Sequence, residues 1–378
     1  MKLVPRRISQ LGRVVTGKTP TTSRQEFFDG EYPFVTPSDL EYDHYYCRST
    51  ERTVTDSAKA ALRNQFVPAE AVMFTCIGAT IGKCAIAPVE CLTNQQINSV
   101  VANADTDPKF VYYLLCHNVD VVKGLGGGAA TPIVSKSKFE EIELLVPPFR
   151  EQQQTISSIL SAYDDQMENN RRRLELLENS ARLLYQEWFV RLHYPGHEHT
   201  PITHGIPQGW ERKRVDQLCE IKGGKQIANE KIQKEGAYPV FGGNGIQGYT
   251  EGFTHEGFVI AFGRVGANCG SVHWSYRGAW INNNASGLVP HSHPEVLLHH
   301  LLNFNFSNLR KGAAQPFIPN GVLSTVEFLE PPQRLKEAFC DIVHPIRLQQ
   351  ATLERQNQRL RAARAVLLPR LMNGEVAV

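Results

Sequence analysis

"LLVPPFREQQQTISSIL", residues 144–160, joins two kinds of sequence and decides the architecture of the chain. Before Pro147-Pro148 the chain is rich in glycine and in short β-type segments, and after it apolar residues recur at helical spacing. Proline is tolerated only in the first turn of a helix, so the pair predicts a long helix that begins just beyond it. The same kind of junction returns as "EPPQRLKEAF", residues 330–339.

The whole chain contains one unit of roughly 190 residues twice. Three pairs of segments match in the same order: 6–18 with 213–225, 78–101 with 266–289, and 128–148 with 312–332. We therefore expect an α+β fold of two pseudo-repeated, Gly-rich domains, each with a modest helix ("PKFVYYLLCHNV" and "PEVLLHHLLNF") and each followed by a long helix. The expected parts are a first domain at 1–148, a helix and linker at 149–200, a second domain at 201–332 and a second helix at 333–378.

Both long helices carry apolar residues at alternating spacings of four and three for nearly five heptads, which is typical of a coiled coil. Residues 149–200 hold six Lys and Arg against eight Asp and Glu, and residues 333–378 hold eight against four. Because the copies are related and their charges are opposite, we expect an antiparallel coiled coil. The expected interface residues are Ile156, Leu160, Leu174, Leu177, Leu184, Phe339, Val343, Ile346, Leu353, Leu360 and Leu367.

Polar residues interrupt this pattern and leave two interpretations open. They set the register of the helices, or they mark a face that is left for partners. The polar positions are Asn170, Gln350, Asn357 and Arg364. The alternative for the helices as a whole is that each packs only on its own domain.

Composition indicates an ordinary water-soluble protein. Of the 378 residues, 42% are apolar and 21% are charged, and the net charge is +2. No apolar run approaches the ~20 residues that a membrane helix needs, and the first ten residues do not resemble a signal peptide. The eight cysteines form no CxxC or paired metal spacing, so we expect free thiols, a cytoplasmic location and no metal.

"GRVVTGKTP", residues 12–20, fits the phosphate-binding pattern G-x-x-x-x-G-K-[ST]. A nucleotide hydrolase would need a buried strand before this loop and a helix after it. Pro20 follows the threonine, and the second copy replaces Gly12 with Cys219 while it keeps Gly224-Lys225. The copies share a short strand ("ISQL", "VDQL") that leads into a Gly-Lys turn, which makes a phosphate loop the weaker interpretation.

Three further motifs also fail. "FGGNG", residues 241–245, fits a methyl-donor site but is followed by loop and strand composition instead of a helix. Asp216, Glu220 and Lys222 resemble a nuclease motif with spacing that is too short, and we expect surface charges, with Asp216 at the start of a strand. The histidines of "HYPGHEHTPITHG" lie among prolines and glycines, which indicates a linker.

Amide side chains give the strongest polar signal in the two domains. "TNQQIN", residues 93–98, and "INNNAS", residues 281–286, occupy the same position of the repeat, and both copies carry Gly loops, "GLGGGAATP" and "RKGAAQP". Asn and Gln present a donor beside an acceptor, as bidentate contact with adenine requires, although amides also satisfy loop backbone. The candidate DNA-binding residues are Lys18, Thr19, Lys83, Asn94, Gln95, Gln96, Lys225, Asn244, Arg264, Asn268, Asn282, Asn283, Asn284 and Lys311.

With these features the chain resembles the DNA-specificity subunit of a type I restriction–modification system. The first junction is similar to that family's boundary between recognition domain and spacer helix, with its P-P-x-x-E-Q signature, and "TGKTP" is similar to an early Gly-Thr-Pro turn. The second junction lacks the Glu-Gln pair. The resemblance covers the whole chain.

The resemblance implies that each domain recognises one half of a split, asymmetric target in double-stranded DNA. It also implies two methyltransferase subunits held by the helices, with restriction and translocase subunits joined through that methyltransferase core. S-adenosylmethionine, ATP and Mg²⁺ would then be used by partner subunits, with no cofactor or catalytic residue in this chain. The alternatives are a stand-alone nucleotide hydrolase, which titration with labelled ATP would detect, and a structural coiled-coil adaptor, which would not shift random duplexes.

Overall fold

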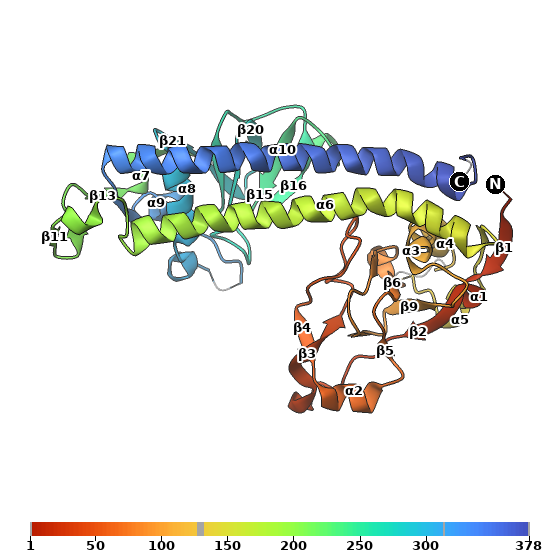
Figure 1. Cartoon of the computed structure of the whole chain (residues 1–378). Coiled ribbons are helices and arrows are strands. Elements are labelled where there is room, and N and C mark those ends of the chain that lie inside the picture. The colour runs from red at the N-terminus through yellow and green to blue at the C-terminus, as the bar shows by residue number, and fades with distance from the viewer. Residues whose placement is uncertain (1, 127–131, 313, 377–378) are drawn as a thin grey trace. The chain divides into compact units, whose positions relative to one another are not determined.

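The computed structural model describes residues 2–126, 132–312 and 314–376, and it divides into two units. Unit 1 comprises Met1–Leu174 and Thr352–Val378, and unit 2 comprises Glu175–Ala351. Each unit therefore contains one globular domain together with parts of both long helices (Figure 1).

The domain of unit 1 contains two four-stranded sheets and a separate strand pair. The first sheet is antiparallel, in the order β2-β9-β6-β7, and the second has the order β4-β3-β8-β5 with β3 parallel to β8. The strands are β1 (Val4–Arg7), β2 (Gly12–Thr16), β3 (Phe28–Val35), β4 (Arg52–Val54), β5 (Phe66–Val67), β6 (Val72–Thr75), β7 (Cys84–Ile86), β8 (Cys91–Thr93), β9 (Ile97–Ala102) and β10 (Glu143–Val146).

Unit 2 repeats this topology strand for strand. Its sheets have the orders β14-β21-β18-β19 and β16-β15-β20-β17, again with one parallel pair, β15 with β20. The strands are β13 (Glu211–Arg214), β14 (Cys219–Gly223), β15 (Tyr238–Gly242), β16 (Gly245–Thr250), β17 (His255–Glu256), β18 (Val259–Gly263), β19 (Val272–Ser275), β20 (Gly278–Ile281), β21 (Ala285–Pro290) and β22 (Glu327–Glu330), with β11 (Ile202–Thr203) and β12 (Ile206–Pro207) in the linker hairpin. The predicted α+β class with two repeated domains is confirmed.

The helices within the domains are short, and their prediction was partly wrong. The expected modest helices are α3 (Pro108–His117) and α8 (Pro294–Asn303), each with proline in its first turn. Six further short α-helices in the described domains were not predicted: α1 (Ile8–Leu11), α2 (Asp56–Leu62), α4 (Val119–Gly124) and α5 (Lys136–Glu141) in unit 1, and α7 (Val215–Leu218) and α9 (Asn320–Leu323) in unit 2.

The segments "ISQL" and "VDQL" are helical turns, not the strands that we predicted. They form α1 (Ile8–Leu11) and α7, so Asp216 lies in a helix. The side-chain oxygen of Gln10 accepts a hydrogen bond from the backbone N–H of Arg7 at 2.8 Å, and Gln217 does the same for Arg214. This capping interaction favours a helical turn, and four residues are too few for periodicity to reveal it.

The long helices begin where the proline pairs predict. Helix α6 (Arg150–Tyr185) has 36 residues and continues into a π-helical turn, Gln186–Val190, while α10 (Gln333–Met372) has 40 residues. At ~1.5 Å per residue they are about 54 and 60 Å long. Of the expected interface residues, Ile156, Leu160, Phe339, Val343 and Leu353 are buried, and the others are half-buried.

Within unit 1 the helices run antiparallel and are held in register by polar contacts. Asn170 donates to Asn357 at 2.9 Å, and Asp164, further toward the start of α6, pairs with Arg364, further toward the end of α10. The buried Asp164 also accepts a hydrogen bond from the hydroxyl of Tyr113 in α3 at 2.6 Å, and Arg364 also pairs with Asp43. These contacts favour register control over a partner face for the polar positions of unit 1.

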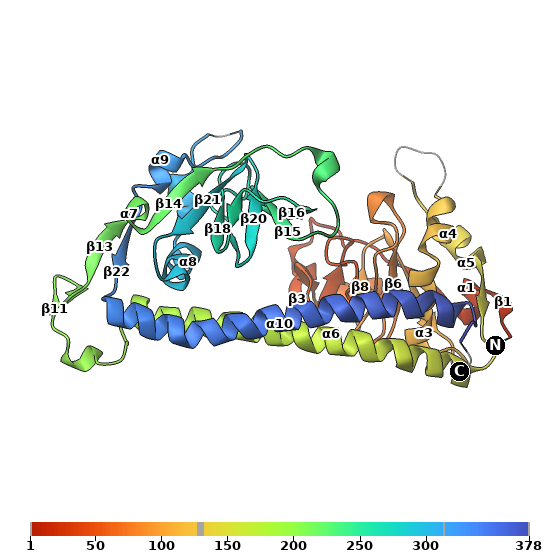
Figure 2. The same cartoon turned by 90° about the horizontal axis from the view of Figure 1, so that it is seen from above.

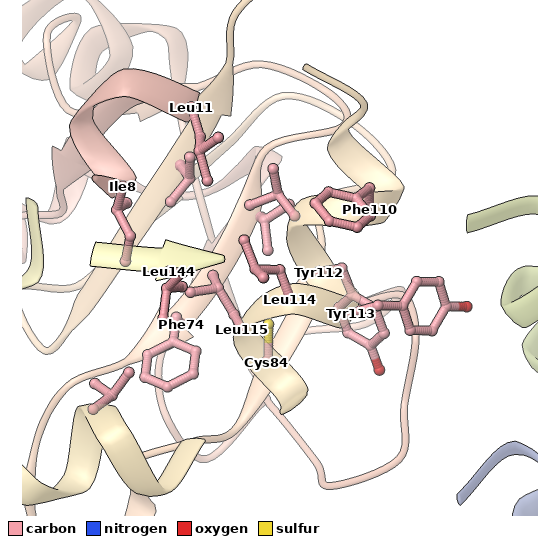
Figure 3. Close-up of a cluster of buried hydrophobic side chains, with 14 of the residues drawn as sticks. Ile8, Leu11, Phe74, Cys84, Phe110, Tyr112, Tyr113, Leu114, Leu115 and Leu144 are labelled. Atoms are coloured by element: carbon pink, nitrogen blue, oxygen red, sulfur yellow. The ribbon is translucent and has the colours of Figure 1, made fainter. Parts of the chain in front are cut away.

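The largest hydrophobic core of unit 1 joins the domain to both helices. Figure 3 shows its centre, where Phe74, Phe110 and Leu114 meet Ile8 and Leu11. Ile156 and Leu160 of α6 and Leu371 and Met372 of α10 belong to the same core. Helix α3 therefore packs on the helix pair as well as on its own sheet.

In unit 2 the helices are also antiparallel, and α8 lies between them and the sheets (Figure 2). The Tyr185 hydroxyl lies 2.6 Å from Nδ1 of His300 in α8, and the Tyr185 ring packs on Phe339. Nearer the middle of each helix, the buried Arg347 pairs with Glu178 of α6 and, at 3.2 Å, with Glu295 of α8. Gln350 donates to Glu178 at 3.2 Å, so this polar position also fixes register.

His299 of α8 is a buried neutral histidine in this cluster. Its Nδ1 lies 2.8 Å from the backbone oxygen of Glu295 and must donate there, which leaves Nε2 to accept from Arg347 at 3.5 Å. Burial lowers the pKa of His299 from 6.5 to about 4, and the Arg347 guanidinium acts in the same direction. Between those two pH values His299 is protonated in the unfolded chain but stays neutral in the folded chain. Acidification therefore favours the unfolded state and destabilises unit 2.

We expect His299→Gln to reduce the pH dependence of the free energy of unfolding of unit 2 between pH 6.5 and 4. The wild type should lose up to about 3 kcal/mol more than the variant across this window, since each pKa unit corresponds to about 1.4 kcal/mol. Calorimetric unfolding of the full chain at several pH values measures the difference. His344→Gln, at an exposed position of α10, is the matched control, and an equal pH slope in His299→Gln and wild type would contradict the assignment.

Candidate nucleic-acid interface

Each domain contains a turn built on one buried asparagine, which we call the amide turn: Asn94–Gln96 in unit 1 and Asn282–Asn284 in unit 2. Asn94 follows β8, and its backbone N–H donates to Val35 of β3 at 2.9 Å. Its side-chain oxygen accepts from the backbone N–H of Gln96 at 3.0 Å. Asn94 is only 8% exposed, so it shapes the turn; Gln95 is exposed, and Gln96 is half-buried.

The amide turn of unit 2 has the same construction. Asn282 follows β20, its backbone N–H donates to Phe241 of β15 at 2.9 Å, and its side-chain oxygen accepts from the backbone N–H of Asn284 at 2.7 Å. It is also 8% exposed, while Asn283 and Asn284 are exposed. The sequence match between the two segments therefore reflects a shared turn, in which the first amide is structural and the following ones differ.

A Gly-Lys turn lies against each amide turn: Gly17-Lys18 in unit 1 and Gly224-Lys225 in unit 2. The backbone N–H of Lys18 donates to the Thr93 carbonyl, and that of Lys225 donates to the Ile281 carbonyl, both at 2.8 Å. A Cβ on Gly17 would overlap the Thr93 backbone, and one on Gly224 would overlap the Asn282 backbone. Only glycine permits this approach, and it leaves both lysine side chains exposed beside the amides.

This geometry contradicts the phosphate-loop alternative. Residues Gly12–Thr16, the first half of the pattern, form β2 and pair with β9 through a regular antiparallel ladder. Their backbone groups are therefore not arranged around an anion, and the next described helical turn begins only at Gln25. "FGGNG" likewise lies in the hairpin between β15 and β16, with no helix after it.

The other candidates divide into those engaged by protein and those exposed. Lys83 donates to the Pro37 carbonyl at 2.9 Å, and Arg264 donates to the Asn283 carbonyl at 3.1 Å, so both brace loops. Asn268 donates to Asn244 at 2.6 Å, and this pair is exposed, as is Lys311. Residues 127–131 and 313 of the two Gly loops lie outside the described residues.

Two exposed glutamines accept hydrogen bonds at these turns, and only one of them, Gln95, was predicted from the sequence. Oε1 of the exposed Gln95 accepts from the hydroxyl of Thr19 at 2.6 Å and from its backbone N–H at 3.3 Å. In unit 2, Oε1 of the exposed Gln247 accepts from Nδ2 of Asn282 at 2.6 Å. Gln247 lies outside the amide-rich segment, and the only sequence signal for it was its position soon after the glycines of "FGGNG".

The remaining motifs form no site among the described residues. Asp216 pairs with Arg214, and Glu220 pairs with Lys222 at 2.8 Å, as expected for surface charges. No group of three or more His, Cys, Asp and Glu side chains in the described chain has the geometry to hold a metal. None of the helices in these described residues combines the length and the apolar character needed to cross a membrane.

The family model for the type I restriction modification DNA specificity domain matches residues 2–179 and 207–361, one match for each repeat. The chain belongs to this specificity family. The type I restriction enzyme MjaIX specificity subunit of Methanocaldococcus jannaschii is 26% identical over 99% of this chain and 93% of its own length. The HindI specificity subunit of Haemophilus influenzae is 30% identical over 37% of this chain and 31% of its own length.

A solved structure shares the fold of this family member. The crystal structure of the type I restriction–modification S subunit from M. genitalium matches with a TM-score of 0.59 and 16% identity. The match covers 98% of this chain and 96% of that one. The family-model match and the curated relatives confirm the sequence-based resemblance to specificity subunits, and this structure confirms the fold.

We expect Gly224→Ala to destabilise unit 2 by about 2 kcal/mol or more, because the new Cβ would push the Gly-Lys turn off the amide turn. Gly223→Ala is the matched control, since a Cβ there meets no atom within 4 Å. Thermal unfolding of the full chain measures both. Equal stability of the two variants would show that the turn can move aside without cost.

Proposed function

We propose that this family member is the sequence-reading subunit of a type I restriction–modification complex, and that each unit recognises one half of a bipartite, asymmetric target in double-stranded DNA. The single observation that carries this proposal is the doubled turn arrangement. Both units hold a Gly-Lys turn against an amide turn in the same way, yet the amides that follow the buried asparagine differ: the exposed Gln95 and half-buried Gln96 in unit 1, and the exposed Asn283 and Asn284 in unit 2. A shared frame with different exposed donors and acceptors is what two different half-sites require.

In this proposal the chain is the non-catalytic member of the complex. Two methyltransferase subunits bind the helices, and restriction and translocase subunits join through them. S-adenosylmethionine, ATP and Mg²⁺ are used by those partners. The holoenzyme would be a site-specific DNA endonuclease and an adenine methyltransferase. A coiled-coil adaptor without base readout is the remaining alternative. DNA-binding experiments distinguish this adaptor from the proposed sequence-reading subunit.

An exposed apolar face on α6 supports docking of a partner. Leu176 and Leu183 are 65% and 52% exposed and stand seven residues apart, which places them on one side of the helix. Leu177, in contrast, is half-buried toward the pairing side. Two large apolar side chains held in water on one helical face are typical of a protein-binding surface.

We expect Leu176→Asp combined with Leu183→Asp to abolish assembly with the methyltransferase subunits while the chain keeps its unfolding temperature. The charges would enter a desolvated interface in the complex but remain in water in the free chain. Size-exclusion chromatography with light scattering measures the stoichiometry. The comparison variant, Leu174→Asp with Leu177→Asp, should lower the unfolding temperature as well; full assembly by the Leu176/Leu183 variant would place docking elsewhere.

We expect the methylome of a host that carries this gene with its methyltransferase partner to show one motif of two different short sequences separated by a fixed gap. Their centres should lie roughly one helical turn, about 10 base pairs, apart if both units face the same side of the duplex. Exchange of residues 1–148 for the first domain of another family member should change one half only. Removal of one heptad from each helix should change the gap and keep both halves. A continuous or palindromic motif would overturn the two-reader proposal.

A further inference from the structure

We infer that Gln95 in unit 1 and Gln247 in unit 2 are specificity-determining residues that act as hydrogen-bond donors only. Each would present its amide nitrogen to the DNA and select a base whose major-groove edge offers an acceptor. The inference rests on the proposed function and adds to it a residue, a direction of hydrogen bonding and a class of base edge for each half-site.

The orientation of the Gln95 amide follows from a backbone group. The backbone N–H of Thr19 can only donate, and it points at Oε1 of Gln95, so the oxygen of the amide must face Thr19. The Thr19 hydroxyl donates to the same oxygen at 2.6 Å. With the oxygen engaged twice, the nitrogen of the exposed amide faces away from the protein, and it has no hydrogen-bond partner in the described part of the chain.

In unit 2 the orientation of the Gln247 amide also follows from a backbone N–H group, which acts through the side chain of Asn282. The backbone N–H of Asn284 donates to Oδ1 of Asn282, which turns Nδ2 of Asn282 toward Gln247. Nδ2 can only donate, so Gln247 must accept through Oε1 and turn its own nitrogen outward. Asn282 is 8% exposed, and its side chain is therefore held while that of Gln247 reaches solvent.

The backbone at Gln247 is also specialised to place this side chain. The register between β15 and β16 pairs Phe241 with Ile246 and Val240 with Gly248, so Gln247 is the extra residue of a β-bulge. Bulges redirect a side chain away from the alternation of a strand. A Cβ on Gly242 would overlap the Gln247 amide, so glycine at that position lets the amide lie flat across the strand and reach Asn282.

A donor-only amide does not match the bidentate contact with adenine that the amide-rich sequence suggested. Bidentate contact needs a free carbonyl oxygen for the adenine N6 amino group, and here that oxygen is used inside the protein. An outward NH₂ group instead fits N7 of a purine, O6 of guanine or O4 of thymine. Cytosine, whose N4 amino group presents a donor, is the base that such a side chain opposes.

Substitution by glutamate reverses the polarity at nearly constant shape. In Gln247→Glu one carboxylate oxygen still accepts from Asn282 and the other becomes an acceptor toward DNA, so the variant should favour a cytosine N4 or adenine N6 donor. Gln95→Glu should do the same in the other half-site, with Thr19 as the retained donor. Gln247→Met keeps the length but removes the donor, and it should relax one position instead of reversing it. Gln208→Glu, an exposed change in the linker hairpin of unit 2, controls for the added charge.

The test is methylome sequencing of hosts that express the methyltransferase complex with the wild-type chain or with each variant. We expect Gln247→Glu to lower methylation of the wild-type motif about tenfold or more and to change one position of one half-site. Gln95→Glu should change one position of the other half-site, and Gln208→Glu should leave the motif intact. Unfolding temperatures of the purified chains establish that each variant is folded.

The two hypotheses fail differently in this experiment. If the wild type gives a bipartite motif and both glutamate variants keep it unchanged, the donor assignment is wrong and the proposed function stands. If a glutamate variant weakens methylation at all sites equally, the glutamine serves general affinity and the inference is also overturned. If the wild type gives no bipartite motif, the proposed function itself fails.

Discussion

One arginine of α10 in each unit, the buried Arg347 and the largely shielded Arg364, fixes the place of the domain on the helix pair, and the rest of the unit depends on this interaction. In unit 1 Arg364 bridges Asp164 of α6 and Asp43 of the domain. In unit 2 Arg347 bridges Glu178 of α6 and Glu295 of α8. Removal of one member of a buried pair typically costs about 3–5 kcal/mol, because the charge left behind has no partner and no water. A slide of either helix by one turn would separate both arginines from their carboxylate partners. The same interactions therefore set the register of the helices and the position of each domain on them.

Sequence predicted the parts of this architecture that repeat or have a long period. The doubled segments gave two domains of one topology, and the proline pairs with their apolar spacing gave α6 and α10 to within a few residues. The spacing pointed to Arg364 as a polar position of the helix pattern, but Asp164 and Arg347 were missed for a physical reason: Asp164 lies one position outside the apolar pattern at Tyr163, and Arg347 lies one position beyond Ile346. A charged residue beside an apolar stripe usually faces water, and only its partner on another element shows that it is buried. The short helices α1 and α7 were assigned to strands because their stability comes from one glutamine cap.

The candidate interface was predictable in position but not in chemistry. The amide-rich segments and Gly-Lys pairs were found from the repeat, and they do meet in each unit. Asn94 and Asn282 hydrogen-bond to the backbone of their own turns. Spacing alone could not distinguish these two asparagines from the amide residues that follow them. Gln247 could not be selected at all, because its role depends on a bulge in β16 and on the bare backbone of Gly242, and neither leaves a periodic signal.

Some amide side chains are hydrogen-bonded within the turns and others face solvent. This division explains how two related domains can recognise different DNA sequences. The groups that set backbone geometry, namely the glycines of the Gly-Lys turns and the buried asparagines, are the same in both units and cannot vary without a steric or hydrogen-bond penalty. The side chains that face solvent are free of this backbone constraint and can differ between the units. Gln95 is held by Thr19 in unit 1, and Gln247 is held by Asn282 in unit 2. Because the inner layer fixes where an outer side chain stands and which atom it turns outward, a change of one exposed residue can alter the hydrogen-bonding pattern without altering the fold. The separation of a rigid frame from a free surface is therefore a physical basis for recognition units that diverge in target while they retain one topology.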